Sequence, residues 1–259
     1  AANGAEFMQR IQRETGLKLD IIKPEEEAQL AVISCAPLVN RKTHNLLVVD
    51  IGGGSTELVW IDISKVPKAD RAQSIMRLHG GFHQAKTDVP AARVVDWISV
   101  PLGVATLRDQ FSDVEDDAAR FALMSWFFEE NLTDFTPYQS IQSQDHFQIV
   151  GTSGTVTTVA ASHLGLKRYD RTKVDGLRMT SAQIDKVIHS YLAMGPGGRR
   201  ADPRIGLDRQ ALIMSGAAIL QALMRCWPTD RLSVADRGLR EGLLYAQMSA
   251  DGVLEEGLG

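Results

Sequence analysis

The sequence has few cysteines, no long apolar run and no excess of positive charge. Its two cysteines, Cys35 and Cys226, form no Cys-x-x-Cys pair, which argues against a disulfide scaffold or a cysteine-held zinc site. Buried free thiols in a reducing cytoplasm are expected instead. No apolar stretch approaches the roughly 18 residues that a membrane helix needs, and the polar start does not resemble a signal peptide. A net charge of −4 disfavours duplex nucleic acid as a partner.

What remains is the composition of an ordinary folded protein, with 44% hydrophobic and 23% charged residues. The length suffices for one large domain or two small ones. The chain does not begin with methionine, and a helical pattern is already under way near Ala1, so we expect a fragment of a longer protein.

Apolar periodicity and turn residues predict an alternation of strands and helices. Strands are expected at residues 19–22, 46–51, 56–63, 94–100, 147–150 and 232–236, and helices at 3–15, 24–36, 115–131, 156–164, 181–194, 209–227 and 238–248. Residues 195–206, rich in glycine, proline and arginine, are expected to form a loop, and residues 66–90 carry no clear pattern. The hairpin at 46–63 supplies antiparallel strands, and strand–helix–strand units supply parallel ones. The expected fold class is therefore α/β, with a mixed β-sheet flanked by helices.

The most informative motif is Asp50-Ile-Gly-Gly-Gly-Ser-Thr-Glu57, which follows a buried strand. Consecutive glycines let the backbone approach a ligand closely, and successive amides in such a turn form an anion site. The predicted phosphate-binding residues here are Gly52, Gly53, Gly54 and Ser55. Asp50 would repel a phosphate, so it should hold a cation or a water. The alternative is a plain glycine-rich hairpin.

A second glycine motif, Gly151-Thr-Ser-Gly-Thr155, also joins an apolar strand to a helix. Amides at the start of a helix favour negative charge. The predicted anion-binding residues in this motif are Thr152, Ser153, Gly154 and Thr155. The alternative is ordinary capping of the helix by Ser153 or Thr155.

The acids Glu25, Glu26 and Glu27 occupy the first turn of a predicted helix. Acids there suit the helix dipole and need no function. The alternative is that one of them faces an anion site and activates water. Helical spacing gives Glu27 a different direction from its two acidic neighbours, so Glu27 should point toward the glycine turn.

Other polar residues carry weaker signals. A metal pair of His79 and His83 is doubtful, because glycines lie between them. Asp116 and Asp117 are expected to face solvent. The basic residues that either bind phosphate or belong to solvated loops are Lys167, Arg168, Arg171, Lys173, Arg199, Arg200 and Arg204.

Several segments together, in their order along the chain, resemble one known family. They are PEEEAQLA, VVDIGGGSTELV, SVPLGVATL, VGTSGTVTTVAA and VADRGLREGLLY. They resemble the Ppx/GppA family, the exopolyphosphatases and guanosine pentaphosphate phosphohydrolases, over nearly the whole chain. The resemblance implies an actin-like (ribonuclease H-like) fold with two lobes around a cleft. Residues 1–36 would end the N-terminal lobe and residues 37–259 would form the C-terminal lobe. A further phosphate turn and an arginine of the N-terminal lobe would precede Ala1.

The resemblance also implies a role for individual residues. Glu27 would be the base that activates water, and Asp50 and Glu57 would hold metal, with Mg²⁺ as the cofactor. The partners would be polyphosphate or guanosine pentaphosphate, and a homodimer is expected as in many members. Gln29 departs from the family, which usually has arginine there, and this removes one basic contact.

Two other function classes stay open at this point. One is an actin-like sugar kinase or ATP-driven chaperone, which shares the glycine-rich turn, although the paired acids of PEEEA favour hydrolysis. The other is a non-catalytic sensor that binds an alarmone.

Overall fold

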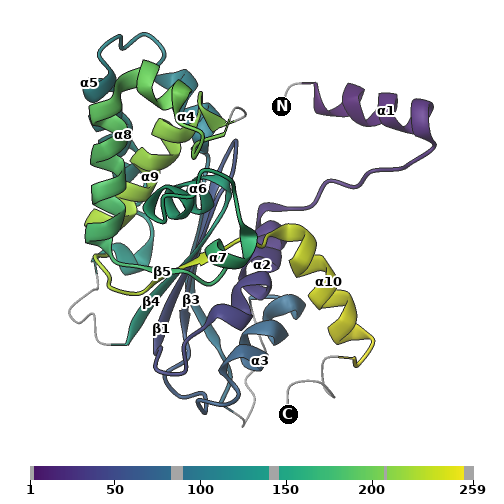
Figure 1. Cartoon of the computed structure of the whole chain (residues 1–259). Coiled ribbons are helices and arrows are strands. Elements are labelled where there is room, and N and C mark those ends of the chain that lie inside the picture. Colours follow the sequence, from purple (N-terminus) through teal and green to yellow (C-terminus); the bar gives the residue numbers. More distant parts are fainter. Residues whose placement is uncertain (1–2, 83–89, 140–145, 207–208, 254–259) are drawn as a thin grey trace.

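The structure, a computed structural model, describes residues 3–82, 90–139, 146–206 and 209–253 (Figure 1). The helices are α1 (Gly4–Thr15), α2 (Pro24–Cys35), α3 (Arg71–Met76), α4 (Val104–Gln110), α5 (Asp117–Glu130), α6 (Gly154–His163), α7 (Arg171–Val174), α8 (Ser181–Ala201), α9 (Ile213–Cys226) and α10 (Leu239–Ala250). The strands are β1 (Asn45–Ile51), β2 (Thr56–Asp62), β3 (Arg93–Val100), β4 (Phe147–Thr152), β5 (Arg178–Met179) and β6 (Leu232–Ala235). Short 3-10 turns are η1 (Ala36–Leu38), η2 (Arg77–Gly80) and η3 (Thr136–Gln139).

The six strands form one mixed sheet in the order β3-β2-β1-β4-β6-β5. Strands β1, β4 and β6 are parallel neighbours, and the remaining neighbours are antiparallel. This confirms the α/β class and the mixed sheet. Because parallel strands end at the same edge of a sheet, the segments that follow β1, β4 and β6 meet there.

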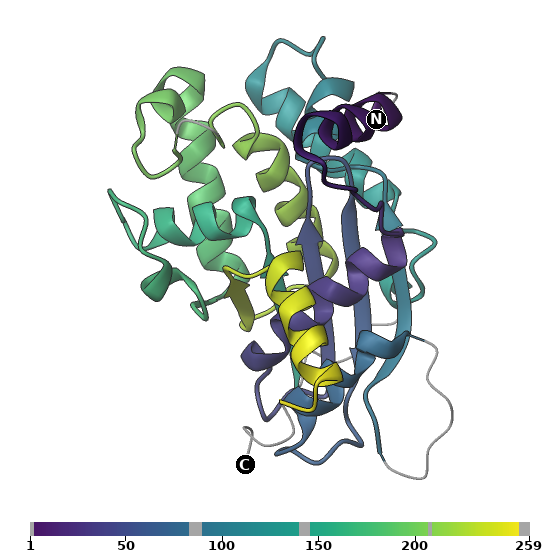
Figure 2. The same cartoon turned by 90° about the vertical axis from the view of Figure 1, so that its right-hand side faces the viewer.

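Side chains of β1 alternate between two hydrophobic layers, as the pleat requires. Leu47 and Val49 pack in the larger core with helices α5, α6, α8 and α9. Leu46 and Val48 pack in a smaller core on the opposite face, under α2 and α3. Figures 1 and 2 show α2, α3 and α10 together on that second face.

Helix α2 lies directly on the sheet and against α10. A Cβ added at Gly242 of α10 would lie 2.1 Å from the carbonyl oxygen of Leu30, so the two helices touch through backbone. Helix α1, by contrast, has no buried residue and stands away from the body (Figure 1). The division into lobes after residue 36 stays a prediction, but in this structure α2 packs with the sheet that follows it.

Three differences from the sequence-based expectations have physical reasons. Residues 19–22 form no strand: Leu19 and Ile21 lie exposed, and none of the described strands pairs with this segment. Residues 195–201 are helical rather than a loop: Gly195 takes a positive φ of 64° that kinks α8, and Pro196 restarts the helix. Short elements such as α3, α7 and β5 were not expected, since their few residues carry no periodicity. Within the described parts, no helix is long and apolar enough to cross a membrane.

Candidate phosphate-binding site

Asp50 lies at the end of β1, in register between Glu57 of β2 and Thr152 of β4. Residues directly opposed across neighbouring strands point to the same face of a sheet. Since side chains alternate along β1, Asp50 shares the face of Leu46 and Val48, which α2 covers. The sheet therefore aims two carboxylates at the helix that carries Glu27.

Glu57 is a buried acid with half of its carboxylate unsatisfied. The residue is 2% exposed, and its Oε1 accepts a hydrogen bond of 2.8 Å from the hydroxyl of Ser99. Its Oε2 is buried and has no hydrogen-bond partner among the described residues. A buried lone carboxylate oxygen is costly unless a donor or a cation satisfies it.

The charge of Glu57 acts on two neighbouring acids, Asp50 and Glu27. Burial, followed by the charges of Glu57 and Glu27, raises the pKa of Asp50 from 3.8 to about 7. Burial, followed by the charge of Glu57, raises the pKa of Glu27 above its usual value. Carboxylates that raise each other's pKa favour a shared proton or a bound cation.

Glu27 differs from its acidic neighbours in direction. It is half-buried beside Glu57, whereas Glu26 is exposed. Glu25 accepts a weak hydrogen bond of 3.4 Å from the Gln29 amide. Glu27 and Glu26 thus differ in burial, and the charge of Glu57 affects Glu27; the role of Glu27 as the base stays a prediction.

The glycine turn presents free backbone donors. Helix α4 holds the turn from one side: the amides of Val104 and Ala105 donate to the carbonyls of Gly52 and Gly53, each at 2.9 Å. The Thr106 hydroxyl donates to the carbonyl of Gly54 at 3.1 Å. In a trans peptide, the carbonyl and the following N–H point in opposite directions. The three amides that follow these carbonyls must therefore point away from α4, and none has a partner among the described residues. They belong to Gly53, Gly54 and Ser55.

Close backbone contact explains a glycine outside the motif. A Cβ at Gly103 would lie 2.5 Å from both the carbonyl oxygen of Gly52 and the carbonyl carbon of Gly53. Only glycine lets α4 begin against the turn. The orientation of the turn amides thus depends on Gly103, which lies about 50 residues further along the chain.

The second glycine motif is partly structural. Ser153 caps α6, its hydroxyl accepting from the amides of Thr155 at 3.2 Å and Val156 at 3.4 Å, and its φ of 132° is unusual for a residue other than glycine. The Thr152 hydroxyl donates to the carbonyl of Arg237. The Thr155 side chain packs against Gly216. Capping, the alternative interpretation, is observed, and the two threonine side chains are engaged within the protein.

Both glycine motifs nevertheless line common space. Gly52, Gly53, Gly154 and Thr155 line one hollow of about 180 Å³. Asp50, Thr152, Ser153 and Gly154 line a second hollow of about 410 Å³ where β1, β4 and β6 end. The sheet register places Asp50 directly beside Thr152, so the two glycine motifs follow neighbouring strands at the same edge of the sheet.

Arg209 lines both hollows and was missed from the sequence. Its Nη1 donates to the carbonyl of Gly154 at 2.7 Å and to the hydroxyls of Thr157 and Thr158 at 3.1 and 2.6 Å. These contacts span more than fifty residues of sequence, and nothing in local spacing marks the arginine. It places a cation beside the second glycine motif.

The remaining basic candidates have varied surroundings. Arg199 is buried and forms an ion pair with Asp117, so it does not belong to a solvated loop. Because of this ion pair, the expectation that Asp117 faces solvent is wrong. Arg204 pairs with the buried Asp202. Asp116 is exposed and caps α5. The other five basic residues are exposed. Arg171 reaches the larger hollow and Arg200 lines a separate one; the five are Lys167, Arg168, Arg171, Lys173 and Arg200.

Among the described residues, no three histidine, cysteine, aspartate or glutamate side chains lie close enough together to hold a metal ion. The suggested pair of His79 and His83 cannot be judged, because His83 lies outside the described residues. Asp50 and Glu57 remain the two carboxylates aimed at the same place.

Fold and site together define a class: an α/β protein whose glycine turn carries three amides without a partner among the described residues, near two carboxylates that the sheet directs to one face. The family model of the Ppx/GppA phosphatase family matches residues 1–251. The chain belongs to the Ppx/GppA phosphatase family.

Individual relatives are distant. Exopolyphosphatase 1 of Mycobacterium leprae is 23% identical over 97% of this chain and 66% of its own length. A guanosine-5'-triphosphate,3'-diphosphate pyrophosphatase of Aeromonas salmonicida is 26% identical over 95% of this chain and 42% of its own length. The chain thus spans between 42% and 66% of the length of these relatives.

Solved structures share the fold. A crystal structure of the Aquifex aeolicus member of the family has a TM-score of 0.69 at 27% identity, covering 97% of this chain and 71% of that one. An exopolyphosphatase from Cytophaga hutchinsonii has a TM-score of 0.74 at 19% identity, covering 96% and 72%. The second likeness shows the fold alone.

Proposed function

We propose that this protein hydrolyses the terminal phosphoanhydride bond of inorganic polyphosphate, of guanosine pentaphosphate, or of both, releasing phosphate. The observation that carries the proposal is the row of amides at Gly53, Gly54 and Ser55, which have no partner among the described residues. Glu57 follows that row on β2, and its charge acts on Glu27 of a neighbouring helix. Family membership and the names of the relatives support the reaction class.

The turn would hold the terminal phosphoryl group. Its amides are fixed by α4 before any ligand arrives, so they need no reorganisation when charge shifts during transfer. Positioning and charge stabilisation supply most of the rate in phosphoryl transfer. Arg209 adds a cation beside the second motif, and Gly154 leads a capped helix whose dipole favours anions.

Glu27 would accept the proton from the attacking water. Its pKa is raised by burial and by Glu57, which makes the carboxylate a stronger base than an exposed glutamate. Its half-buried position leaves one side open to water. Glu57 lies on the sheet beside it, and its charge is the second cause of the raised pKa of Glu27.

Asp50 and Glu57 would hold Mg²⁺. The fit rests on the buried Oε2 of Glu57, which has no hydrogen-bond partner among the described residues. Carboxylate oxygens suit Mg²⁺, which is commonly held by one or two carboxylates plus phosphate oxygens. When bound, the ion would neutralise charge on the phosphate chain. The free thiols of Cys35 and Cys226 support a cytoplasmic location as part of the same proposal, and a homodimer stays a prediction.

Phosphate release separates the function classes. The purified protein would be incubated with Mg²⁺ and polyphosphate, guanosine pentaphosphate or ATP in parallel, and orthophosphate measured over time. We expect release from one or both of the first two substrates well above that from ATP. Preferred hydrolysis of ATP would indicate an ATP-driven actin-like protein, and tight binding without release would indicate a sensor.

A further inference from the structure

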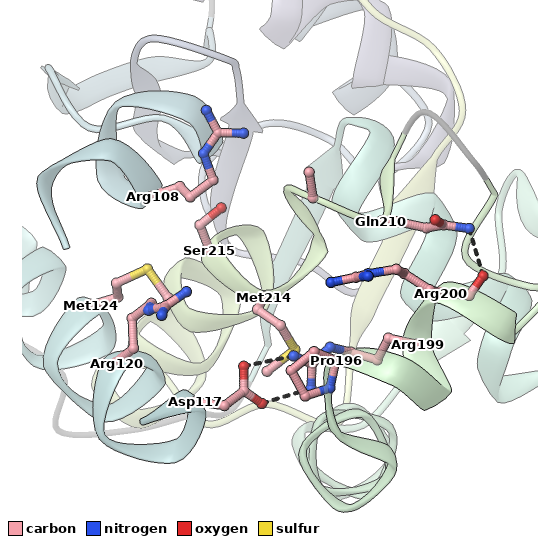
Figure 3. Close-up of a pocket in the computed structure, with 11 residues that line it drawn as sticks. Arg108, Asp117, Arg120, Met124, Pro196, Arg199, Arg200, Gln210, Met214 and Ser215 are labelled. Atoms are coloured by element: carbon pink, nitrogen blue, oxygen red, sulfur yellow. Dashed lines mark hydrogen bonds and ion pairs between the residues drawn. The ribbon is translucent and has the colours of Figure 1, made fainter. Parts of the chain in front are cut away.

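A hollow lined by arginines lies among helices α4, α5, α8 and α9 (Figure 3). Its volume is about 360 Å³. The charged side chains around it are Arg108, Arg120, Arg199, Arg200 and Asp117. The start of α9 divides it from the hollow beside the glycine turn, because Ala211 and Met214 line this one while Leu212 and Ile213 line the other.

Among the residues that the structure describes, Asp117 supplies the carboxylate that lines this hollow, and it is already paired. Both oxygens of Asp117 accept from the Arg199 guanidinium, at 2.8 and 2.6 Å, and the Arg199 side chain is 6% exposed. Arg199 also donates to the carbonyl of Tyr191 at 2.8 Å. This buried bidentate pair forms a fixed, neutral wall at the base of the hollow (Figure 3).

Two other guanidiniums keep an uncompensated charge. Arg120 donates to the carbonyls of Val114 at 2.6 Å and Glu115 at 3.5 Å, which orients its charge without neutralising it. Arg200 is exposed, and neither arginine pairs with a carboxylate in the part of the chain that the structure describes. Figure 3 shows the Arg200 guanidinium directed toward the middle of the hollow. Arg108 is paired with its neighbour Asp109 at 2.6 Å, an exposed contact that is weak in water.

The local sequence builds this arrangement. The left-handed Gly195 breaks α8, and Pro196 begins a new helical turn that lines the hollow together with Arg199 and Arg200. A straight helix would give these arginines a different direction. The Met-Gly-Pro-Gly-Gly-Arg-Arg segment is thus a wall of a cavity rather than a solvated loop.

We propose that the hollow is a second binding site for phosphate-class oxyanions, separate from the candidate active site. The planar guanidinium matches a phosphate's oxygens in a bidentate way, and two unneutralised guanidiniums in one concave site attract a polyanion. At about 30 Å³ per water, the cavity has the volume of roughly a dozen waters, enough for several linked phosphoryl groups. The ligand is either a condensed phosphate chain or orthophosphate. The proposal does not rest on the proposed function.

Binding can be measured without turnover. With EDTA present, tripolyphosphate and orthophosphate would be titrated separately into the protein by calorimetry, and the arginine Nε–H signals followed by NMR. The variants are Arg200→Gln alone and Arg120→Gln with Arg200→Gln. A double variant with the same charge change, Arg13→Gln with Arg178→Gln, removes two exposed arginines elsewhere. Arg200→Gln removes no side-chain hydrogen bond or ion pair to another described residue, so it keeps the test valid if the loss of Arg120 disturbs folding.

The double variant at the hollow should lose one equivalent of oxyanion binding, or bind it at least about 30-fold more weakly, since each lost charged hydrogen bond is worth roughly tenfold or more. The Arg120 and Arg200 signals should shift on titration, and the Arg199 signal should shift less. Much tighter binding of tripolyphosphate than of orthophosphate would identify a chain-holding site, and equal affinities a site for orthophosphate. Equal losses in both double variants, or an unmoved Arg200 signal, would overturn the proposal. Normal phosphate release with no binding at the hollow would leave the proposed function intact.

Discussion

Asp50 should make the protein less stable as the pH rises. Its pKa is 3.8 ordinarily and about 7 in the folded protein, because of burial and then the charges of Glu57 and Glu27. Between these two values the folded state binds a proton that the unfolded chain has released. Stability contributed by this group is therefore present at low pH and is lost as pH rises toward about 7. Above that pH, the cost of the buried charge is on the order of 4 kcal/mol, at about 1.4 kcal/mol per pKa unit.

The substitution Asp50→Asn removes the charge and keeps the shape. In metal-free protein, urea unfolding at about pH 8 should show the variant more stable than the parent, by up to about 4 kcal/mol. Near pH 4 the difference should be small, since the folded parent then carries a neutral carboxyl. Asp113→Asn, which changes an exposed aspartate, serves as the control. Parallel pH profiles for parent and Asp50→Asn would refute the reasoning about the carboxylate cluster.

The parent protein and Asp50→Asn also test whether Asp50 binds Mg²⁺. Added Mg²⁺ should raise the unfolding free energy of the parent at about pH 8, because a ligand that binds only the folded state stabilises it. It should leave Asp50→Asn nearly unchanged. An equal effect of Mg²⁺ on both proteins would remove Asp50 from the metal site.

Two backbone contacts give further predictions. Gly103→Ala should displace the glycine turn, which would lower the free energy of unfolding by about 1–3 kcal/mol through overpacking and weaken phosphate binding measured by calorimetry. Gly80→Ala, whose added Cβ meets nothing within 4 Å, is the control. Unchanged phosphate binding in Gly103→Ala would show that α4 does not set the turn. Gly242→Ala should lower the free energy of unfolding by about 1–3 kcal/mol, because its Cβ would lie 2.1 Å from the Leu30 carbonyl oxygen. Gly238→Ala, whose Cβ would meet open space, is the control. Equal stability of the two variants would argue against the α2–α10 contact.

Short-range sequence patterns predicted the fold class and much of the candidate site. The apolar run before Asp50, the hairpin after it and the strand before Gly151 all appear as predicted, because buried strands and glycine turns leave short-range signals. The family motifs added Glu27, whose local setting alone indicated only a helix start.

What the sequence did not reveal depends on distant contacts. Gly103 matters because α4 touches the turn, and Arg209 because α9 begins beside the second motif. The Arg199–Asp117 pair joins two helices 82 residues apart. The extended segment at Leu19 looked like a strand, but a strand needs a neighbour to pair with, and none lies there.

The central claim is that Glu27 is the base that activates water at the glycine turn. The most direct measurement is phosphate release from polyphosphate and guanosine pentaphosphate by Glu27→Gln, beside Glu26→Gln as the exposed control from the same helical turn. Loss of a general base costs on the order of 10² to 10⁴ in rate, so Glu27→Gln should lose turnover by that factor while substrate affinity survives on the untouched amides. Glu26→Gln should keep normal turnover. Near-normal turnover in both variants, or lost affinity with turnover retained in Glu27→Gln, would contradict the assignment.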